Sequence, residues 1–167
     1  MFVKDIRANG NCGFRAIAGL IGFGEDAWMH ICQNLIDELR TLWAKYVDLF
    51  GGYDRACFID NSLNFWESDR SAPLQNWMTM PDMDHLITSS YNVILHLLSF
   101  EQCLTFLPLR LVSLPSHEQV TITIEFVNNN HFVQVALIDD YSMPHIMIQW
   151  FRYKYDCTAV WITPYTE

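Results

Sequence analysis

The residues with the clearest chemical potential form one block near the N-terminus, Asn9-Gly10-Asn11-Cys12-Gly13-Phe14-Arg15-Ala16. Gly and Asn tolerate positive φ angles, so the block predicts a tight turn that leads into a helix at Cys12. A helix N-terminus stabilises a thiolate through its dipole and its unpaired N–H groups, and so lowers the thiol pKa. The same N–H groups can hold the oxyanion of an acyl-transfer intermediate. Cys12 is therefore the candidate nucleophile.

A thiol nucleophile needs a general base, and the second half of the chain offers His131. It follows Asn128-Asn129-Asn130 and opens the segment Phe132-Val133-Gln134-Val135, which is typical of a strand. A histidine at the mouth of a strand is held rigidly and stays accessible. A cysteine followed by a histidine about 120 residues later is also the chain order of papain-like proteases. The two residues together indicate nucleophilic catalysis.

Helical patterns dominate the first half of the chain and strand patterns dominate the second half. Apolar residues recur every three or four positions over 25–50, which predicts one long helix, and the spacing over 12–21 is similar. Strand-like segments follow at 93–98, 103–107, 121–127, 131–138 and 146–153. This order predicts an α+β fold, with one sheet flanked by helices, in a single domain that spans residues 1–167.

The composition excludes several classes of protein. The chain has 167 residues, with 10 Lys+Arg against 19 Asp+Glu and a formal net charge of −9. Such an acid excess argues against non-specific nucleic-acid binding, which needs clustered Lys and Arg. Five widely spaced cysteines without a C-x-x-C pair indicate free thiols in a reducing compartment. No signal-peptide core or membrane span is present, so we expect a soluble intracellular protein, cytoplasmic or nuclear.

No spacing of histidines and cysteines is typical of a metal site. Asp82, Asp84 and His85 are metal-binding residue types, but acids behind Pro81 are better explained by a helix start, where they stabilise the helix dipole. We therefore expect no metal ion and no cofactor.

These residues resemble those of a known family, the OTU (ovarian tumour) cysteine proteases, which are deubiquitinases. Their nucleophile motif reads D-G-N-C-x-F-R-A, and this chain has the block 9–16. The segments 77–83, 103–109, 128–132 and 163–165 are also similar to OTU domains of transposon-associated eukaryotic proteins. The resemblance spans nearly the whole chain. It implies a papain-like fold with a mostly antiparallel central sheet, the catalytic Cys at a helix N-terminus and the His at a strand start.

Carried over residue by residue, the resemblance makes Cys12 the nucleophile and His131 the general base. The turn N–H groups of Gly10, Asn11 and Cys12 would form the oxyanion hole. Where the family has an Asp three residues before the nucleophile, this chain has Asn9. An amide can still hold the loop by hydrogen bonds, but it supplies no negative charge.

The second departure from the family concerns the residue that orients the imidazole. Many family members place Asn or Asp two residues after the catalytic His, and this chain has Val133 there. The orienting partner must then come from elsewhere or be missing. The candidates are Asn129, which lies two residues before His131, and Asp5, which lies on a short strand expected over residues 2–6.

The resemblance implies a thiol-dependent deubiquitinase, which hydrolyses the bond after the C-terminal glycine of ubiquitin or a ubiquitin-like modifier through a thioester. The expected partner is ubiquitin or polyubiquitin, with no nucleic acid and no membrane, and the protein is expected to be a monomer. The departures at Asn9 and Val133 leave an alternative open, a catalytically weakened OTU domain that binds ubiquitin or another protein. A nucleic-acid module inherited from a transposon fits poorly with the acid excess.

Overall fold

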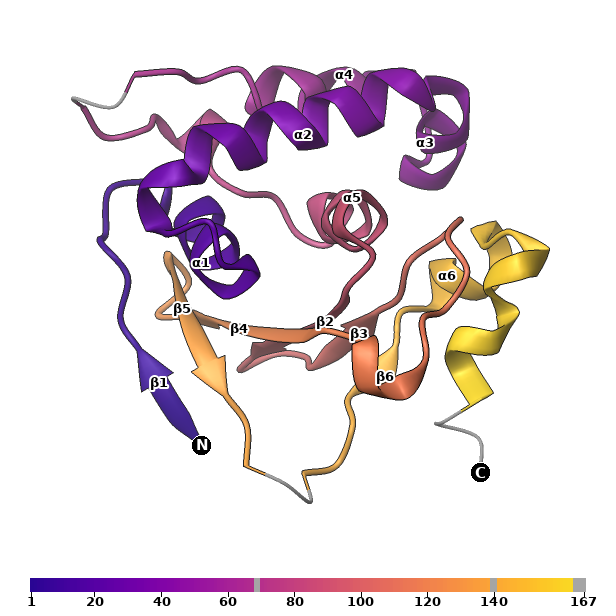
Figure 1. The fold of residues 1–167 in the computed structure, drawn as a ribbon. Coiled ribbons are helices and arrows are strands. Elements are labelled where there is room, and N and C mark those ends of the chain that lie inside the picture. Colours follow the sequence, from indigo (N-terminus) through magenta and orange to yellow (C-terminus); the bar gives the residue numbers. More distant parts are fainter. Residues whose placement is uncertain (68–69, 139–140, 164–167) are drawn as a thin grey trace.

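The computed structural model of the chain describes residues 1–67, 70–138 and 141–163, and six strands form one sheet within it (Figure 1). The strands are β1 (Phe2–Lys4), β2 (Ile94–Ser99), β3 (Leu104–Phe106), β4 (Thr121–Val127), β5 (His131–Ala136) and β6 (His145–Ile146). The α-helices are α1 (Cys12–Ile21), α2 (Trp28–Thr41), α3 (Trp43–Phe50), α4 (Tyr53–Ser62), α5 (Asp82–Tyr91) and α6 (Ile148–Tyr153). Short 3₁₀ helices span Glu25–Ala27, Leu74–Asn76, Ser116–Glu118 and Asp156–Ile162.

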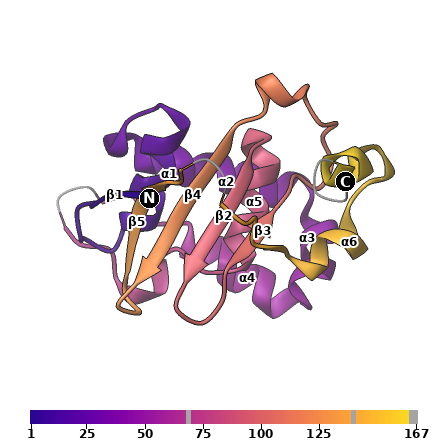
Figure 2. The same ribbon diagram turned by 90° about the horizontal axis from the view of Figure 1, so that it is seen from below.

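The sheet is mixed, with the strand order β1-β5-β4-β2-β3-β6. The β1–β5, β5–β4 and β2–β3 pairs are antiparallel, whereas β4–β2 and β3–β6 are parallel. Helices α1 and α5 lie on one face of the sheet, and α2 and α4 form a further layer above them (Figure 1). The expected α+β class, a sheet flanked by helices, is confirmed. The β1 edge and the α3–α6 region lie at opposite ends of the molecule in both views (Figure 2).

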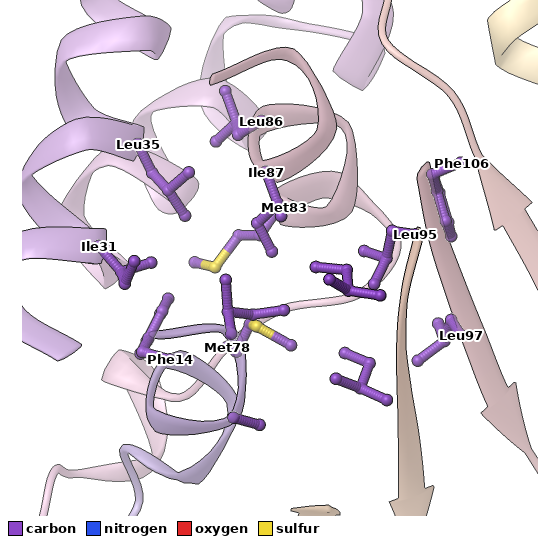
Figure 3. Close-up of a cluster of buried hydrophobic side chains, with 14 of the residues drawn as sticks. Phe14, Ile31, Leu35, Met78, Met83, Leu86, Ile87, Leu95, Leu97 and Phe106 are labelled. Carbon is purple, nitrogen blue, oxygen red and sulfur yellow. The ribbon is translucent and has the colours of Figure 1, made fainter. Parts of the chain in front are cut away.

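A hydrophobic core fills the space between the helices and the sheet. Ten of its side chains reach this space from α1, α2, α5, the neighbouring loop and two strands (Figure 3): Phe14, Ile31, Leu35, Met78, Met83, Leu86, Ile87, Leu95, Leu97 and Phe106. Each fully buried side chain of this size contributes about 1.5–3 kcal/mol to folding. The core therefore holds α1 firmly against the sheet, and with it the start of α1.

The expected helix over 25–50 is interrupted at Leu42, which leaves the helical region with φ −117° and ψ 37°. The apolar spacing continues past this break, because α3 still buries Tyr46 against the rest of the core. The prediction of one uninterrupted helix was therefore wrong at this position. The break lets α3 turn back toward α4 (Figure 1).

The segment 146–153 was expected to be a strand, and it is mostly the helix α6. Only His145 and Ile146 pair with β3, and the N–H of Met147 still donates to Thr105 O at 2.8 Å. The chain then turns into α6, which buries Trp150, whose indole N–H donates to Pro108 O at 2.9 Å. Burial of this large side chain favours the helix over a longer edge strand.

The acids at the start of α5 do not act as caps. Asp82 forms an ion pair with Arg55 at 2.6 Å, and Asp84 is fully buried with no hydrogen-bond partner among the described residues. Burial raises the pKa of the Asp84 carboxyl well above its ordinary value, and the charge of Asp82 adds to the shift. Across the described ranges, no group of three or more His, Cys, Asp or Glu is arranged to hold a metal ion. No helix among those residues is long and apolar enough to cross a bilayer.

Candidate active site

The cysteine block and the histidine block meet where α1 and β5 begin. Helix α1 starts at Cys12, directly after a turn in which Gly10 adopts a φ of +79°. Strand β5 starts at His131, after a turn in which Asn128 and Asn129 have φ angles of 54° and 56°. Asn tolerates this left-handed conformation better than most residues, so both turns depend on their Gly and Asn content.

A hydrogen bond joins the two blocks directly. The backbone N–H of Phe132 donates to Cys12 Sγ, with 3.4 Å between nitrogen and sulfur, across 120 positions of the chain. A second bond, from Gln134 Nε2 to Ala16 O at 3.1 Å, ties β5 to α1 one turn further along. The position of Cys12 relative to β5 is therefore set by polar contacts in addition to the core.

A small pocket opens onto both candidate catalytic residues. Its volume is about 190 Å³, and its lining consists of Ala8, Gly10, Cys12, Trp77, Asn130 and His131. The indole N–H of Trp77 donates to Ala72 O at 3.0 Å, which holds this ring in place. Trp77 was not among the expected site residues, because nothing in the spacing of a single tryptophan separates a pocket wall from a packing residue.

His131 is held by the carboxylate of Asp5, the residue that follows β1. Its Nε2 lies 2.8 Å from Asp5 Oδ1, and its Nδ1 is buried without a hydrogen-bond partner among the described residues. An ionised carboxylate can only accept, so Nε2 carries the proton in this pair. The neutral imidazole then has its basic lone pair on Nδ1, which is free to take a proton.

Asp5 reaches His131 because of the strand pairing. Strand β1 runs antiparallel to β5, with Lys4 opposite Gln134, so the chain after β1 continues toward the end of β5 that begins with His131. The hydrogen bond from His131 lowers the pKa of the Asp5 carboxyl, and a bond from the Ile6 N–H at 2.9 Å lowers it further. Asp5 is therefore ionised at neutral pH.

Of the two candidates for orienting His131, the structure brings only Asp5 to the imidazole. Asn129 lies in the exposed turn before β5, and no hydrogen bond links it to His131 within the described part of the chain. Val133, at the position where many OTU proteases have Asn or Asp, is a buried residue of the sheet. The carboxylate thus approaches the ring from the residue that follows the neighbouring strand β1.

The thiol of Cys12 is in a less favourable environment than its place at a helix N-terminus suggested. The residue is 5% exposed, and burial raises the pKa of the thiol above its ordinary value. Hydrogen bonds from the N–H groups of Phe132, Gly13 and Cys12 offset part of this rise, while the charge of Asp5 adds to it. Desolvation of the anion outweighs the helix terminus here, so the isolated thiol is neutral at pH 7.

The expected three-donor oxyanion hole loses one of its members. The side chain of Asn9 accepts a hydrogen bond from the Asn11 N–H at 3.2 Å, so that donor is occupied. The N–H groups of Gly10 and Cys12 have no oxygen acceptor among the described residues, and the Cys12 N–H interacts with its own sulfur. Asn9 therefore shapes the turn, and the N–H groups of Gly10 and Cys12 are the remaining candidate donors to an oxyanion.

No family model and no curated protein matches this sequence. Solved structures, in contrast, share its fold. The viral OTU domain protease from Dera Ghazi Khan virus superposes with a TM-score of 0.58 at 13% identity, over 83% of this chain and 81% of that one. The OTU domain of OTUD1 gives 0.56 at 14% identity, over 81% and 85%. The Hazara virus OTU bound to ubiquitin gives 0.50 at 13% identity, over 82% and 81%. The chain therefore has the fold of OTU domains.

Proposed function

We propose that this chain is a cysteine-type deubiquitinase, a thiol isopeptidase that cleaves after the C-terminal glycine of ubiquitin or a ubiquitin-like modifier. The observation that carries the proposal is the arrangement of Cys12, His131 and Asp5 at one pocket, with the Asp5 carboxylate 2.8 Å from the imidazole. The OTU fold supports the class of reaction, and the Hazara virus OTU, which is similar in fold, was solved bound to ubiquitin.

The first half of the reaction forms a thioester. Nδ1 of His131 takes the proton of the Cys12 thiol, and the thiolate attacks the carbonyl carbon of the modifier's last glycine. The N–H groups of Gly10 and Cys12 hold the oxyanion, and the imidazolium gives its proton to the leaving lysine amine as the C–N bond breaks. Because the thiol starts out neutral, this proton transfer to His131 is needed to generate the nucleophile.

The second half releases the modifier. His131 takes a proton from water, the hydroxide adds to the thioester carbonyl, and the C–S bond breaks. The imidazolium returns its proton to the Cys12 sulfur, and the new carboxylic acid releases its proton to the solvent. In both halves the Asp5 carboxylate keeps the proton on Nε2 and stabilises the imidazolium, as the carboxylate of a catalytic triad does. No metal ion or cofactor enters the scheme.

The alternative function is a catalytically weakened OTU domain that binds ubiquitin or another protein. Two observations favour it: Asn9 occupies one oxyanion donor, and the side chain of Asp5 is 85% exposed, so water screens its charge. For the leading function we propose that the partner is ubiquitin, polyubiquitin or a ubiquitin-like modifier. For both functions we propose that the chain acts as a monomer inside the cell, in the cytoplasm or nucleus.

The test uses a ubiquitin probe that carries an electrophile at its C-terminus. The wild-type chain is expected to form a covalent adduct at Cys12, and Cys12→Ala is expected to form none. Cys103→Ala is the matched control, because Cys103 is an exposed free thiol outside the pocket. If neither the ubiquitin probe nor a probe built on any ubiquitin-like modifier forms an adduct, the proposed enzymatic function is refuted. Tight ubiquitin binding without an adduct would support the alternative.

A further inference from the structure

A second pocket is lined by residues of α3 and of the α6 segment. Both elements lie at the end of the molecule opposite β1 (Figures 1 and 2). The volume of this second pocket is about 280 Å³, larger than that of the pocket at Cys12. The lining is rich in cations and tyrosines: Leu42, Lys45, Tyr46, Asp48, Leu49, Leu109, Arg110, Arg152, Tyr153, Lys154 and Tyr155. None of these residues also lines the pocket at Cys12, so the proposed hydrolase activity does not explain the second pocket.

The cations of this pocket differ from the others in the chain. The chain has ten Lys and Arg, and within the described ranges six of them form ion pairs with carboxylates: Lys4, Arg15, Arg40, Arg55, Arg70 and Arg110. The four without such a pair are Arg7, Lys45, Arg152 and Lys154, and the last three line this pocket. In an acidic protein with a net charge of −9, three of the four cations without an ion pair among the described residues thus lie in one pocket.

Aromatic rings and main-chain bonds build the walls that carry these cations. Nζ of Lys45 lies 5.1 Å from the centre of the Tyr155 ring, and the guanidinium of Arg152 lies 5.4 Å from that of Tyr153. The Tyr153 hydroxyl donates to Asp48 O at 3.1 Å, and the Tyr155 N–H donates to Leu109 O at 2.7 Å. Rings of this kind attract cations and restrict their motion without neutralising them.

The charge balance of the pocket is positive. Arg110 is held by Glu38 through both carboxylate oxygens, so it contributes little net field. The lining contains one carboxylate, that of Asp48, and three cations that form no ion pair among the described residues. Cations without carboxylate partners in a concave site raise the local concentration of anions and give them charge-assisted hydrogen bonds.

We propose that this pocket binds a small soluble polyanion that carries phosphate groups. The guanidinium of Arg152 suits a phosphate because it can donate two parallel hydrogen bonds, and the two lysines add point charges. The volume of about 280 Å³ suits a small molecule rather than a folded partner. The net charge of −9 disfavours a long nucleic acid, which would meet repulsion beyond the pocket.

Isothermal titration of the wild-type chain with inorganic pyrophosphate at low salt tests the site. We expect saturable one-to-one binding that weakens as salt is added. Arg152→Gln and Lys45→Gln, which lie on opposite walls, should each weaken binding by roughly tenfold, since a hydrogen bond to a charged group is lost. Arg7→Gln removes the same charge at an exposed position outside the pocket, and it should leave the affinity within about twofold of wild type.

Each other outcome decides against the site. Absence of saturable pyrophosphate binding would show that the pocket is not a phosphate site. An equal loss of affinity in Arg7→Gln would show that the net electric field of the protein, and not the pocket, attracts the anion. Binding to vesicles that contain a phosphoinositide, but not to pyrophosphate, would assign the surface to a membrane and overturn the proposal. The two pocket variants alter exposed side chains, and thermal unfolding of each confirms that the fold is kept.

Discussion

The Asp5 carboxylate lies 2.8 Å from Nε2 of His131, although 126 positions separate the two residues in the chain. It approaches the imidazole from the residue that follows the edge strand β1, whereas many OTU proteases supply the orienting group from two residues after the His. Cys12 and His131 thus line one pocket, and a carboxylate reaches the imidazole despite Val133. The departure at that position therefore concerns where a carboxylate partner for the imidazole comes from.

Replacing Asp5 tests the role of its charge. Asp5→Ala should lower kcat for ubiquitin cleavage by about 10- to 100-fold with a smaller change in KM, because orientation of His131 and stabilisation of the imidazolium are both lost. Asp5→Asn keeps an acceptor and should lose less. Asp54→Asn, which changes an exposed acid remote from the pocket, is the matched control. Unchanged kcat in Asp5→Ala would remove Asp5 from the mechanism.

The reactivity of Cys12 should depend on His131 in a pH-dependent way. Burial raises the pKa of the thiol above its ordinary value of 9.0, so without a base little thiolate exists at neutral pH. The rate of Cys12 alkylation by iodoacetamide is followed by mass spectrometry. In His131→Ala this rate should still increase with pH above pH 9. The wild type should reach its maximal rate at lower pH. Identical profiles for the two proteins would mean that His131 does not accept the proton.

Gly10 should tolerate no side chain. Its φ is +79°, and an added Cβ would lie 2.6 Å from Ala72 O and 2.7 Å from Trp77 Nε1. Gly10→Ala should therefore displace the turn and abolish labelling by the ubiquitin probe. Gly22→Ala is the matched control, with a φ of +100° and nothing within 4 Å of the added atom.

The control separates backbone strain from steric clash. Gly22→Ala should cost about 1–2 kcal/mol of unfolding free energy and keep the labelling. Gly10→Ala should cost more and lose it. Equal labelling of the two variants, measured under conditions in which both are folded, would show that the turn does not need the close approach of Gly10 to Ala72 and Trp77.

Asp84 should make the protein less stable as pH rises. The raised pKa means that the folded state keeps this proton at pH values where the unfolded chain has lost it, so stability decreases with pH above the ordinary value of 3.8. Asp84→Asn should raise the free energy of unfolding at pH 7 by about 1–3 kcal/mol and give no gain near pH 3. Urea denaturation at both pH values measures this. A loss of stability at pH 7 would mean that the carboxylate has a stabilising partner.

The sequence could predict the local parts of the site better than the tertiary ones. Cys12 and His131 stand in blocks whose Gly and Asn content encodes the turns around them, and both do line one pocket. Asp5 remained one of two candidates because its proximity to His131 depends on the β1–β5 pairing, which no local pattern encodes. Trp77 was missed for a similar reason, since its place in the pocket wall follows from the packing of a loop against the turn.

The fold, like the site, could be predicted where local patterns determine it and could not where long-range contacts do. The α+β class follows from the order of helical and strand patterns, and it was predicted correctly. The break at Leu42 and the helix α6 were not, because an apolar segment satisfies its burial in more than one secondary structure. In 148–153 the deciding factor is burial of Trp150 beneath the end of the sheet, a long-range contact.

Strand β1 also makes the triad dependent on the least protected part of the sheet. It has three residues, all exposed, and among the described strands it pairs with β5 alone. Such an element frays at a small fraction of the free energy needed for global unfolding, so its amide protons should exchange with deuterium long before those of β4. Each fraying event releases the carboxylate from the imidazole while the thiol, the pocket and the core stay in place. In the proposed hydrolase, the fraction of time that β1 is docked therefore limits the fraction of molecules in which Asp5 can orient His131.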